Sequence, residues 1–175
     1  MINTCFIIIY KETTKMILII ESIVLCFIFT LLVYIFSREP IKTLYNYPPN
    51  IQERVKSLPE YKDKIPSTKN KISAKLIACV LFVSLITLMM KYINGCRSFK
   101  DTFINSFILW SVVNLYDAIV LDIVWFCHDP YFVLKGTEDM IEDYHDYLFH
   151  IKGFFIGELI ALIICSIAGL VVKFL

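Results

Sequence analysis

Three acidic residues lie inside apolar stretches of the sequence, where an unpaired charge is costly. Asp117 and Asp122 fall in one apolar run and Glu158 in the next. A charge at the centre of a bilayer raises the free energy of insertion by about 2.5–3.5 kcal/mol, so such groups normally face protein or water. Carboxyl groups placed there can bind a proton or a cation. We therefore expect an intramembrane polar cluster of Asn114, Asp117, Asp122, Glu158 and Lys75.

A second set of potential ligands follows Asp122 and includes all three histidines. If this segment is helical, Glu142 and His145 stand at i and i+3, the spacing used by carboxylate-bridged metal sites. The pattern lacks the two-histidine spacing of H-E-x-x-H enzymes and the residue order of an EF-hand. A solvated acidic loop and a divalent-cation site both remain open, and the site would draw on Glu142, His145, His150, His128 and Asp129.

The composition indicates that lipid surrounds most of the chain. Of its 175 residues, 58% are hydrophobic, compared with about 45–50% in soluble domains. These residues gather in four runs, each close to the length of about 20 residues that a helix needs to cross a bilayer. We predict an all-α polytopic membrane protein, a four-helix transmembrane bundle with short interfacial helices, with spans at about 16–36, 72–93, 103–127 and 151–172.

Two longer polar loops, 37–71 and 128–150, connect these spans. The first loop is too short to bury a hydrophobic core of its own, so we predict a single integral membrane domain over 1–175. Within that loop, Ile51, Val55 and Leu58 recur at i, i+4 and i+7. This spacing is typical of a short amphipathic helix, which we expect to lie along the membrane surface.

The first span, 16–36, raises two further expectations. It ends without a small-residue cleavage site, so we expect a retained anchor rather than a cleaved signal peptide; the choice between Met1 and Met16 as the start of translation stays open. Glu21 lies five residues inside this span. We expect its carboxylate to reach the lipid head groups there and to stay apart from the acids of the third and fourth spans.

The fourth apolar run carries a small residue at every fourth position. Such a stripe allows another helix backbone to approach closely, so it predicts a helix-packing surface. Its members are Gly153, Gly157, Ala161, Cys165 and Gly169. The six cysteines form no C-x-x-C pair, which favours apolar packing roles over a zinc or redox site.

The distribution of cations predicts the orientation of the chain in a membrane. The two polar loops together carry nine Lys and Arg residues, whereas the connections and ends on the opposite face carry six. By the positive-inside rule, the loops are cytoplasmic and both termini lie outside. The formal net charge of +1 and the lack of a nucleic-acid-binding motif predict no nucleic-acid partner.

Several short stretches resemble a group of small four-span membrane proteins of low-GC Gram-positive bacteria. They are Tyr47-Pro48-Pro49, Ile51 to Val55, Asn114 to Asp122, Lys135 to Glu138 and His150 to Phe154. The resemblance covers most of the chain past residue 40. It implies a location in a bacterial plasma membrane and brings no assigned activity with it.

Three functions follow as alternatives. The leading one is a small carrier-like or accessory protein of the lipid bilayer whose acids handle a cation or a proton. The second is a non-catalytic subunit whose small-residue stripe docks another membrane protein or a second copy of the chain. The third is a metal-dependent membrane enzyme. Because the sequence has no Ser-His-Asp order, phosphate loop or dinucleotide fingerprint, a non-enzymatic role is favoured and no further cofactor is expected.

Overall fold

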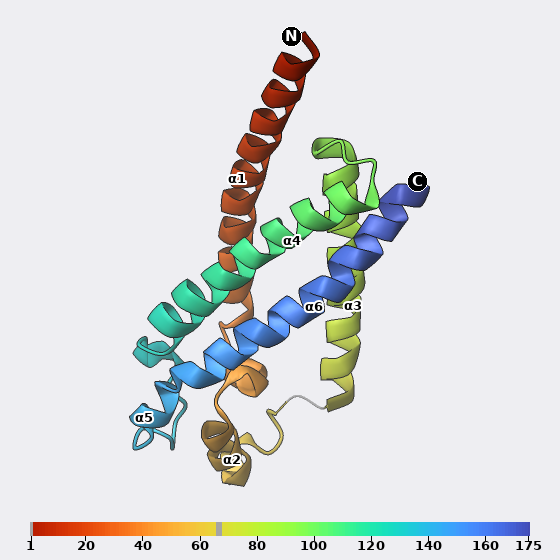
Figure 1. Cartoon of the computed structure of the whole chain (residues 1–175). Helices are drawn as coiled ribbons and strands as arrows, with labels where there is room; N and C mark the ends of the chain where they lie inside the picture. Colours follow the sequence, from red (N-terminus) through yellow and green to blue (C-terminus); the bar gives the residue numbers. More distant parts are fainter. Residues whose placement is uncertain (1, 66–67) are drawn as a thin grey trace.

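Helices account for every regular element in the described part of the chain (Figure 1). This computed structural model describes the backbone at residues 2–65 and 68–175, and the side chains at 13–65, 77 and 79–175. In chain order the elements are α1 (Ile2–Phe36), η1 (Pro40–Asn46), α2 (Pro49–Ser57), η2 (Pro59–Tyr61), α3 (Thr68–Leu88), η3 (Met89–Ile93), α4 (Phe99–Tyr116), η4 (Asp117–Phe126), η5 (Pro130–Phe132), α5 (Ile141–Tyr144) and α6 (Tyr147–Phe174).

Three helical segments in the described residues are long and apolar enough to cross a membrane. They are Thr13–Phe36, Phe99–Phe126 and Ile141–Phe174. The predicted span at 72–93 falls on α3 and η3, where the described apolar helix is the shorter stretch Cys79–Ile93. The all-α class is therefore confirmed, and three of the four predicted spans coincide with helices long and apolar enough to cross a membrane.

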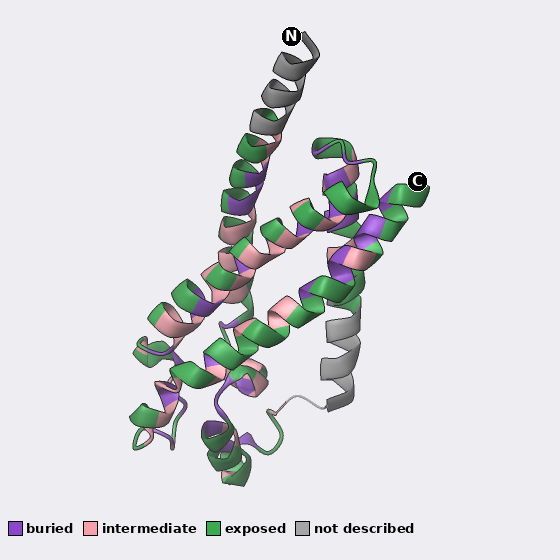
Figure 2. Cartoon of the chain, in the orientation of Figure 1, coloured by how far each residue is buried: buried purple, intermediate pink, exposed green. Residues whose placement is uncertain are grey.

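The long helices are arranged around an antiparallel pair, α4 and α6, which run side by side (Figure 1). Helix α1 packs on α4, and α3 packs on α6. Both termini lie at one end of the molecule, and α2 and α5 lie at the other. Figure 2 shows that the outer faces of α4 and α6 are largely exposed, as expected for surfaces that contact lipid.

At the end of the molecule that holds the termini, side chains from all four long helices meet in one apolar cluster. We call it the terminal cluster. It joins α1, the α3–η3 helix, α4 and α6 through Leu18, Ile86, Met90, Cys96, Leu109, Ala168 and Val172.

Local side-chain contacts fix where the two central helices begin. Ser98 precedes α4, and its Oγ accepts a hydrogen bond from the backbone N of Asp101 at 3.0 Å. Asp146 precedes α6, and its Oδ1 accepts from the backbone N of Phe149 at 3.1 Å. Both are N-caps, which satisfy backbone donors that a helix leaves free in its first turn.

The two polar loops fold together into a small apolar unit, which we call the loop cap. Its core consists of Leu44, Tyr47, Ile51, Val55, Tyr61, Leu134 and Tyr144. The face of α2 that was expected to lie on the membrane is buried in this core instead, with Ile51 and Val55 both 0% exposed. That expectation was wrong because it considered the first loop alone. The second loop supplies the other half of the core.

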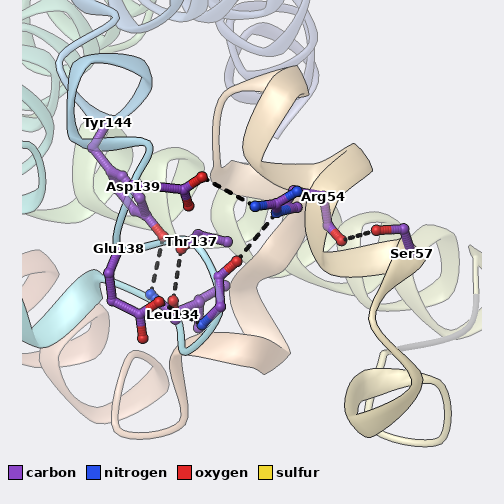
Figure 3. A network of polar contacts seen from close by, with 8 residues as sticks. Arg54, Ser57, Leu134, Thr137, Glu138, Asp139 and Tyr144 are labelled. Atoms are coloured by element: carbon purple, nitrogen blue, oxygen red, sulfur yellow. Dashed lines mark hydrogen bonds and ion pairs between the residues drawn. The ribbon is translucent and has the colours of Figure 1, made fainter.

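Polar contacts join the two halves of the loop cap (Figure 3). Arg54 of α2 donates to the backbone O of Gly136 at 3.2 Å and pairs with Asp139 at 3.0 Å. The hydroxyl of Tyr144 lies 2.7 Å from Oγ1 of Thr137 and accepts from the backbone N of Leu134 at 3.0 Å. The Arg54–Asp139 pair is exposed and adds about 0–1 kcal/mol, so the buried contacts of Tyr144 contribute more to holding the fold.

Aromatic rings connect the loop cap to the end of η4. The Tyr47 ring packs edge-on against Phe126 with centroids 4.8 Å apart, and its hydroxyl donates to the backbone O of Phe132 at 3.1 Å. Burial raises the pKa of the Tyr47 phenol above its ordinary value, because the ionised form would lose its hydration. Tyr47 therefore acts as a neutral hydrogen-bond donor in the core.

Replacing Ile51 by Ala tests whether α2 belongs to this core. We expect the free energy of unfolding to fall by about 2–5 kcal/mol, since the substitution leaves a cavity in a fully buried site. Thermal unfolding in detergent, together with the rate of protease cleavage in the two loops, measures the effect. Glu53→Ala, on the exposed face of α2, is the matched control. Equal stability of the two variants would contradict burial of Ile51 and would return α2 to the membrane surface.

Candidate functional site

A line of polar side chains runs along the interface between α4–η4 and α6. We call it the polar strip and define it as Ser111, Asn114, Asp117, Asp122, His150 and Glu158. The strip lies within the two apolar segments Phe99–Phe126 and Ile141–Phe174. It contains three carboxyl groups and one imidazole, which are all groups that can exchange protons.

Glu158 of α6 is held by two side chains of α4. Ser111 Oγ donates to Oε2 at 2.7 Å, and Asn114 Nδ2 donates to Oε1 at 2.8 Å. The second hydrogen of the Asn114 amide bonds the backbone O of Phe154 at 3.0 Å. Each carboxylate oxygen therefore has a donor from the neighbouring helix, and hydrogen bonds to a charged group are stronger than neutral ones.

Asp122 and His150 form the second contact of the polar strip. Nδ1 of His150 lies 3.0 Å from Oδ2 of Asp122. The imidazole is 4% exposed and packs edge-on against Phe126 and Phe149, with centroids 5.4 and 5.2 Å away. Its Nε2 is buried and has no hydrogen-bond partner among the described residues. One imidazole nitrogen is therefore fixed by Asp122, and the ring also lies near the Cys127 thiol.

The helix geometry around Asp117 explains why two acids share this site. From Asp117 to Phe126 the chain is a π-helix, and the backbone N of Cys127 donates to the O of Asp122 at 3.0 Å. Hydrogen bonds in a π-helix join residues five apart, and Asp117 and Asp122 are separated by five positions. Asp117 accordingly lies near enough to Asp122 and His150 for their charges to interact.

The structure thus divides the predicted polar cluster into two neighbouring groups. Asn114 contacts Glu158, and Asp117 lies with Asp122 and His150. The side chain of Lys75, also predicted in this cluster, lies outside the described residues. Sequence reasoning missed Ser111, although it stands one turn before Asn114 on the same helix, because serine is common in membrane helices without such a role.

The residues considered as metal ligands take other roles. The His128 and His145 rings stack with centroids 5.1 Å apart, and Nδ1 of His128 lies 2.8 Å from the backbone O of Ile123. Asp129 accepts from Trp125 Nε1 at 3.0 Å. His150 pairs with Asp122, and the described residues contain no group of three or more His, Cys, Asp or Glu side chains placed to hold a metal ion.

The helix expected to align Glu142 with His145 is shorter than that spacing requires. Helix α5 covers Ile141–Tyr144, and His145 follows its end. The neighbouring acids bind parts of the protein instead, since Asp143 accepts from Asn50 and Glu138 accepts from the backbone N of Gly136 at 2.8 Å. Several acidic residues of this loop therefore help to hold the loop cap together.

Most of the small-residue stripe on α6 faces α4. A Cβ added to Gly157 would lie 2.6 Å from Oδ1 of Asn114, and one added to Gly169 would lie 2.9 Å from the Phe99 ring. Ala161 and Cys165 are both 0% exposed. A Cβ on Gly153 would meet no atom within 4 Å. The stripe is therefore used inside the chain, and Gly153 is the member left facing outward.

The sequence suggested that the Glu21 carboxylate reaches the lipid head groups, but the structure buries it. It is 7% exposed, and both carboxylate oxygens accept from Asn94 Nδ2 at 2.9 Å. The expectation was wrong because the connection between η3 and α4 returns beside α1 and covers the carboxylate. Glu21 packs beside the terminal cluster, at the opposite end of the molecule from the loop cap.

Comparison with known proteins adds no relative from which a function could be transferred. No family model, curated protein or solved structure matches this chain.

A substitution at Gly157 tests the contact between Asn114 and Glu158. Gly157→Ala places a methyl group where the Asn114 amide now lies, so we expect a loss of about 1–3 kcal/mol from the broken, half-buried hydrogen bonds of Asn114. Gly153→Ala is the matched control, and we expect it to be neutral or stabilising by about 0.5–1 kcal/mol, as for alanine in an unobstructed helix. Thermal unfolding of both variants in the same lipid and detergent measures the difference. A Gly157 variant as stable as the Gly153 variant would disprove the close packing.

Proposed function

We propose that this chain is a multi-pass integral membrane protein whose polar strip carries a proton or a small cation between α4–η4 and α6. The proposal rests on the charge balance around the Asp122–His150 pair. Three carboxyl groups share the strip with a single imidazole, so an excess of two negative charges arises when all four groups are ionised. Among the described residues, no Lys or Arg forms an ion pair with these acids.

An excess of negative charge between apolar helices needs compensation. Burial of an uncompensated charge is strongly unfavourable, because the helices and lipid cannot replace its hydration. A bound proton or a bound cation would remove the excess. The imidazole of His150 and the carboxyl group of Asp117, whose charges interact, support protons as the simplest choice, since both groups can take up a proton without any change in the helices.

We further propose four membrane spans, with α3 and η3 as the second. An even number of spans is supported by the position of both termini at one end of the molecule (Figure 1). The excess of cations on the loops, nine against six, supports a cytoplasmic loop cap and outward-facing termini in a bacterial plasma membrane. The polar strip would then reach the cytoplasmic side through Asp122 and His150.

Flux measurements in liposomes test the proposed function. Purified protein is reconstituted with an internal pH dye, and a potassium diffusion potential drives proton entry; Na⁺ and K⁺ fluxes are followed in parallel. We expect Asp122→Asn and Glu158→Gln each to reduce the flux tenfold or more, a change equivalent to about 1.4 kcal/mol in the barrier. Both replacements keep the shape of the side chain and remove its charge.

Glu39→Gln provides the matched control, because Glu39 is exposed outside the apolar spans and pairs there with Lys42 at 2.7 Å. We expect this variant to conduct like the unmodified protein. The proposal fails if the Asp122 and Glu158 variants retain both ion binding and transport, or if the unmodified protein supports no flux above empty liposomes.

A further inference from the structure

A separate carboxyl group is buried at the end of the molecule that holds the termini. Glu21 of α1 is 7% exposed, and Asn94, between η3 and α4, is 4% exposed. Asn94 Nδ2 donates to both oxygens of Glu21 at 2.9 Å. Among the described residues, Asn94 is the hydrogen-bond donor observed for the Glu21 carboxylate. None of the residues in this pair belongs to the polar strip.

One amide is a weak counterpart for a buried carboxylate. An ionised carboxyl group that leaves water normally needs a cation or several hydrogen-bond donors. The charged and titratable side chains of the described segments at this end are Lys15, Lys91, Tyr92, Cys96, Arg97, Lys100, Asp101 and Lys173. Burial raises the pKa of the Cys96 thiol above its ordinary value. Since a thiol with a raised pKa is neutral at physiological pH, Cys96 brings no charge that would stabilise an ionised Glu21.

Asn94 can serve Glu21 in both of its protonation states. An amide presents two donors on nitrogen and an acceptor on oxygen, and a half-turn of the side chain exchanges them. With the nitrogen toward Glu21, the amide donates to a carboxylate, as the structure shows. With the oxygen toward Glu21, it would accept the O–H of a carboxylic acid. Asn94 Oδ1 is buried and has no hydrogen-bond partner among the described residues. Besides its bonds to Glu21, the amide nitrogen has one long contact, to the backbone O of Met89 at 3.5 Å, which the turn would give up.

Water is close to the pair. Gly95, which follows Asn94 in the chain, is exposed, and so is Arg97 beyond the buried Cys96. Gly95 has a φ of +64°, in the region that glycine adopts most readily, and it turns the chain directly after Asn94, the C-cap of η3. A proton could therefore travel between the solution and Glu21 through a short surface connection rather than along the bundle.

We propose that Glu21 and Asn94 form a second proton-binding site, located on the side of the membrane that holds the termini. The carboxyl group of Glu21 takes up one proton from that side and releases it there. The Asn94 amide turns to donate to the carboxylate or to accept from the acid. This site uses different residues from the polar strip and does not depend on the function proposed for it.

Infrared difference spectroscopy in lipid nanodiscs tests this proposal directly. A protonated carboxylic acid has a carbonyl stretch separate from those of amides and carboxylates, and labelling with ¹³C-glutamate distinguishes Glu21 from the aspartates. We expect a label-sensitive band that rises and falls between about pH 4 and pH 9, the range reached by carboxyl groups in proteins. Glu21→Gln should abolish this band, while Glu158→Gln and Asp122→Asn should preserve it.

A second variant tests the part played by Asn94. Asn94→Leu removes the donor to the carboxylate and the acceptor from the acid. Because the bond to the charged form is the stronger of the two, we expect the midpoint of the band to move up by about one pH unit. Glu39→Gln, on the exposed loop, should leave the midpoint unchanged. Thermal unfolding of each variant verifies that it is folded before spectra are compared.

Three results would overturn the proposal. The first is the absence of any Glu21-dependent band over this pH range in folded protein. The second is a midpoint that does not respond to Asn94→Leu, which would remove Asn94 from the site. The third is a midpoint that changes when Na⁺ replaces K⁺ at constant ionic strength, which would assign the site to an alkali cation. Loss of liposome flux in the Asp122 variant with an intact Glu21 band would separate this site from the polar strip.

Discussion

A carboxyl group between apolar helices has to find its hydrogen-bond partners on a neighbouring segment, because lipid provides none. Three acids of the long helices follow this requirement. Glu158 is bound by α4, Asp122 is bound by α6, and Glu21 is bound by the connection that leads into α4. These contacts also set the relative position of the helices, since a shift along the helix axis by one turn would separate every pair.

The loop cap supports the same arrangement from outside the apolar spans. Its Tyr47 ring packs against Phe126, and the Phe126 ring packs against His150. One aromatic residue therefore lies between the core of the loops and the imidazole of the polar strip. Because the loop cap holds Phe126 in place, it also limits the movement of the His150 ring. The orientation of His150 toward Asp122 therefore depends on both the packing against Phe126 and the contact with Asp122.

Features that depend on local composition could be predicted from the sequence. The apolar runs identified the long helices, and depth within those runs identified Asn114 and Glu158, which the structure brings together. The four-residue spacing of small side chains indicated a packing face on α6, and two of its glycines, Gly157 and Gly169, lie against α4. These predictions succeed because hydrophobic length and helical periodicity are properties of one continuous stretch of chain.

Features that depend on contacts between distant segments, or on a change of helix type, could not be predicted from the sequence. The pairing of Asp122 with His150 joins two helices, and the π-helix that brings Asp117 near it departs from the usual 3.6-residue repeat. The core of the loop cap combines two loops that are each polar on average. The partner of Glu21 lies on a turn more than 70 residues away. None of these relations leaves a periodic pattern in the sequence.

The loop cap also constrains how the protein is made. Tyr47 leaves the ribosome 85 residues before Phe132, with which it bonds, and at about 5–20 residues per second this separation lasts roughly 4–17 s. During that interval Ile51 and Val55 have no partners from the second loop, so the apolar face of α2 is not yet covered by Leu134 and Tyr144. The core of the loop cap can therefore be completed only after the third helical segment has been made, which places its closure late in the synthesis of the chain.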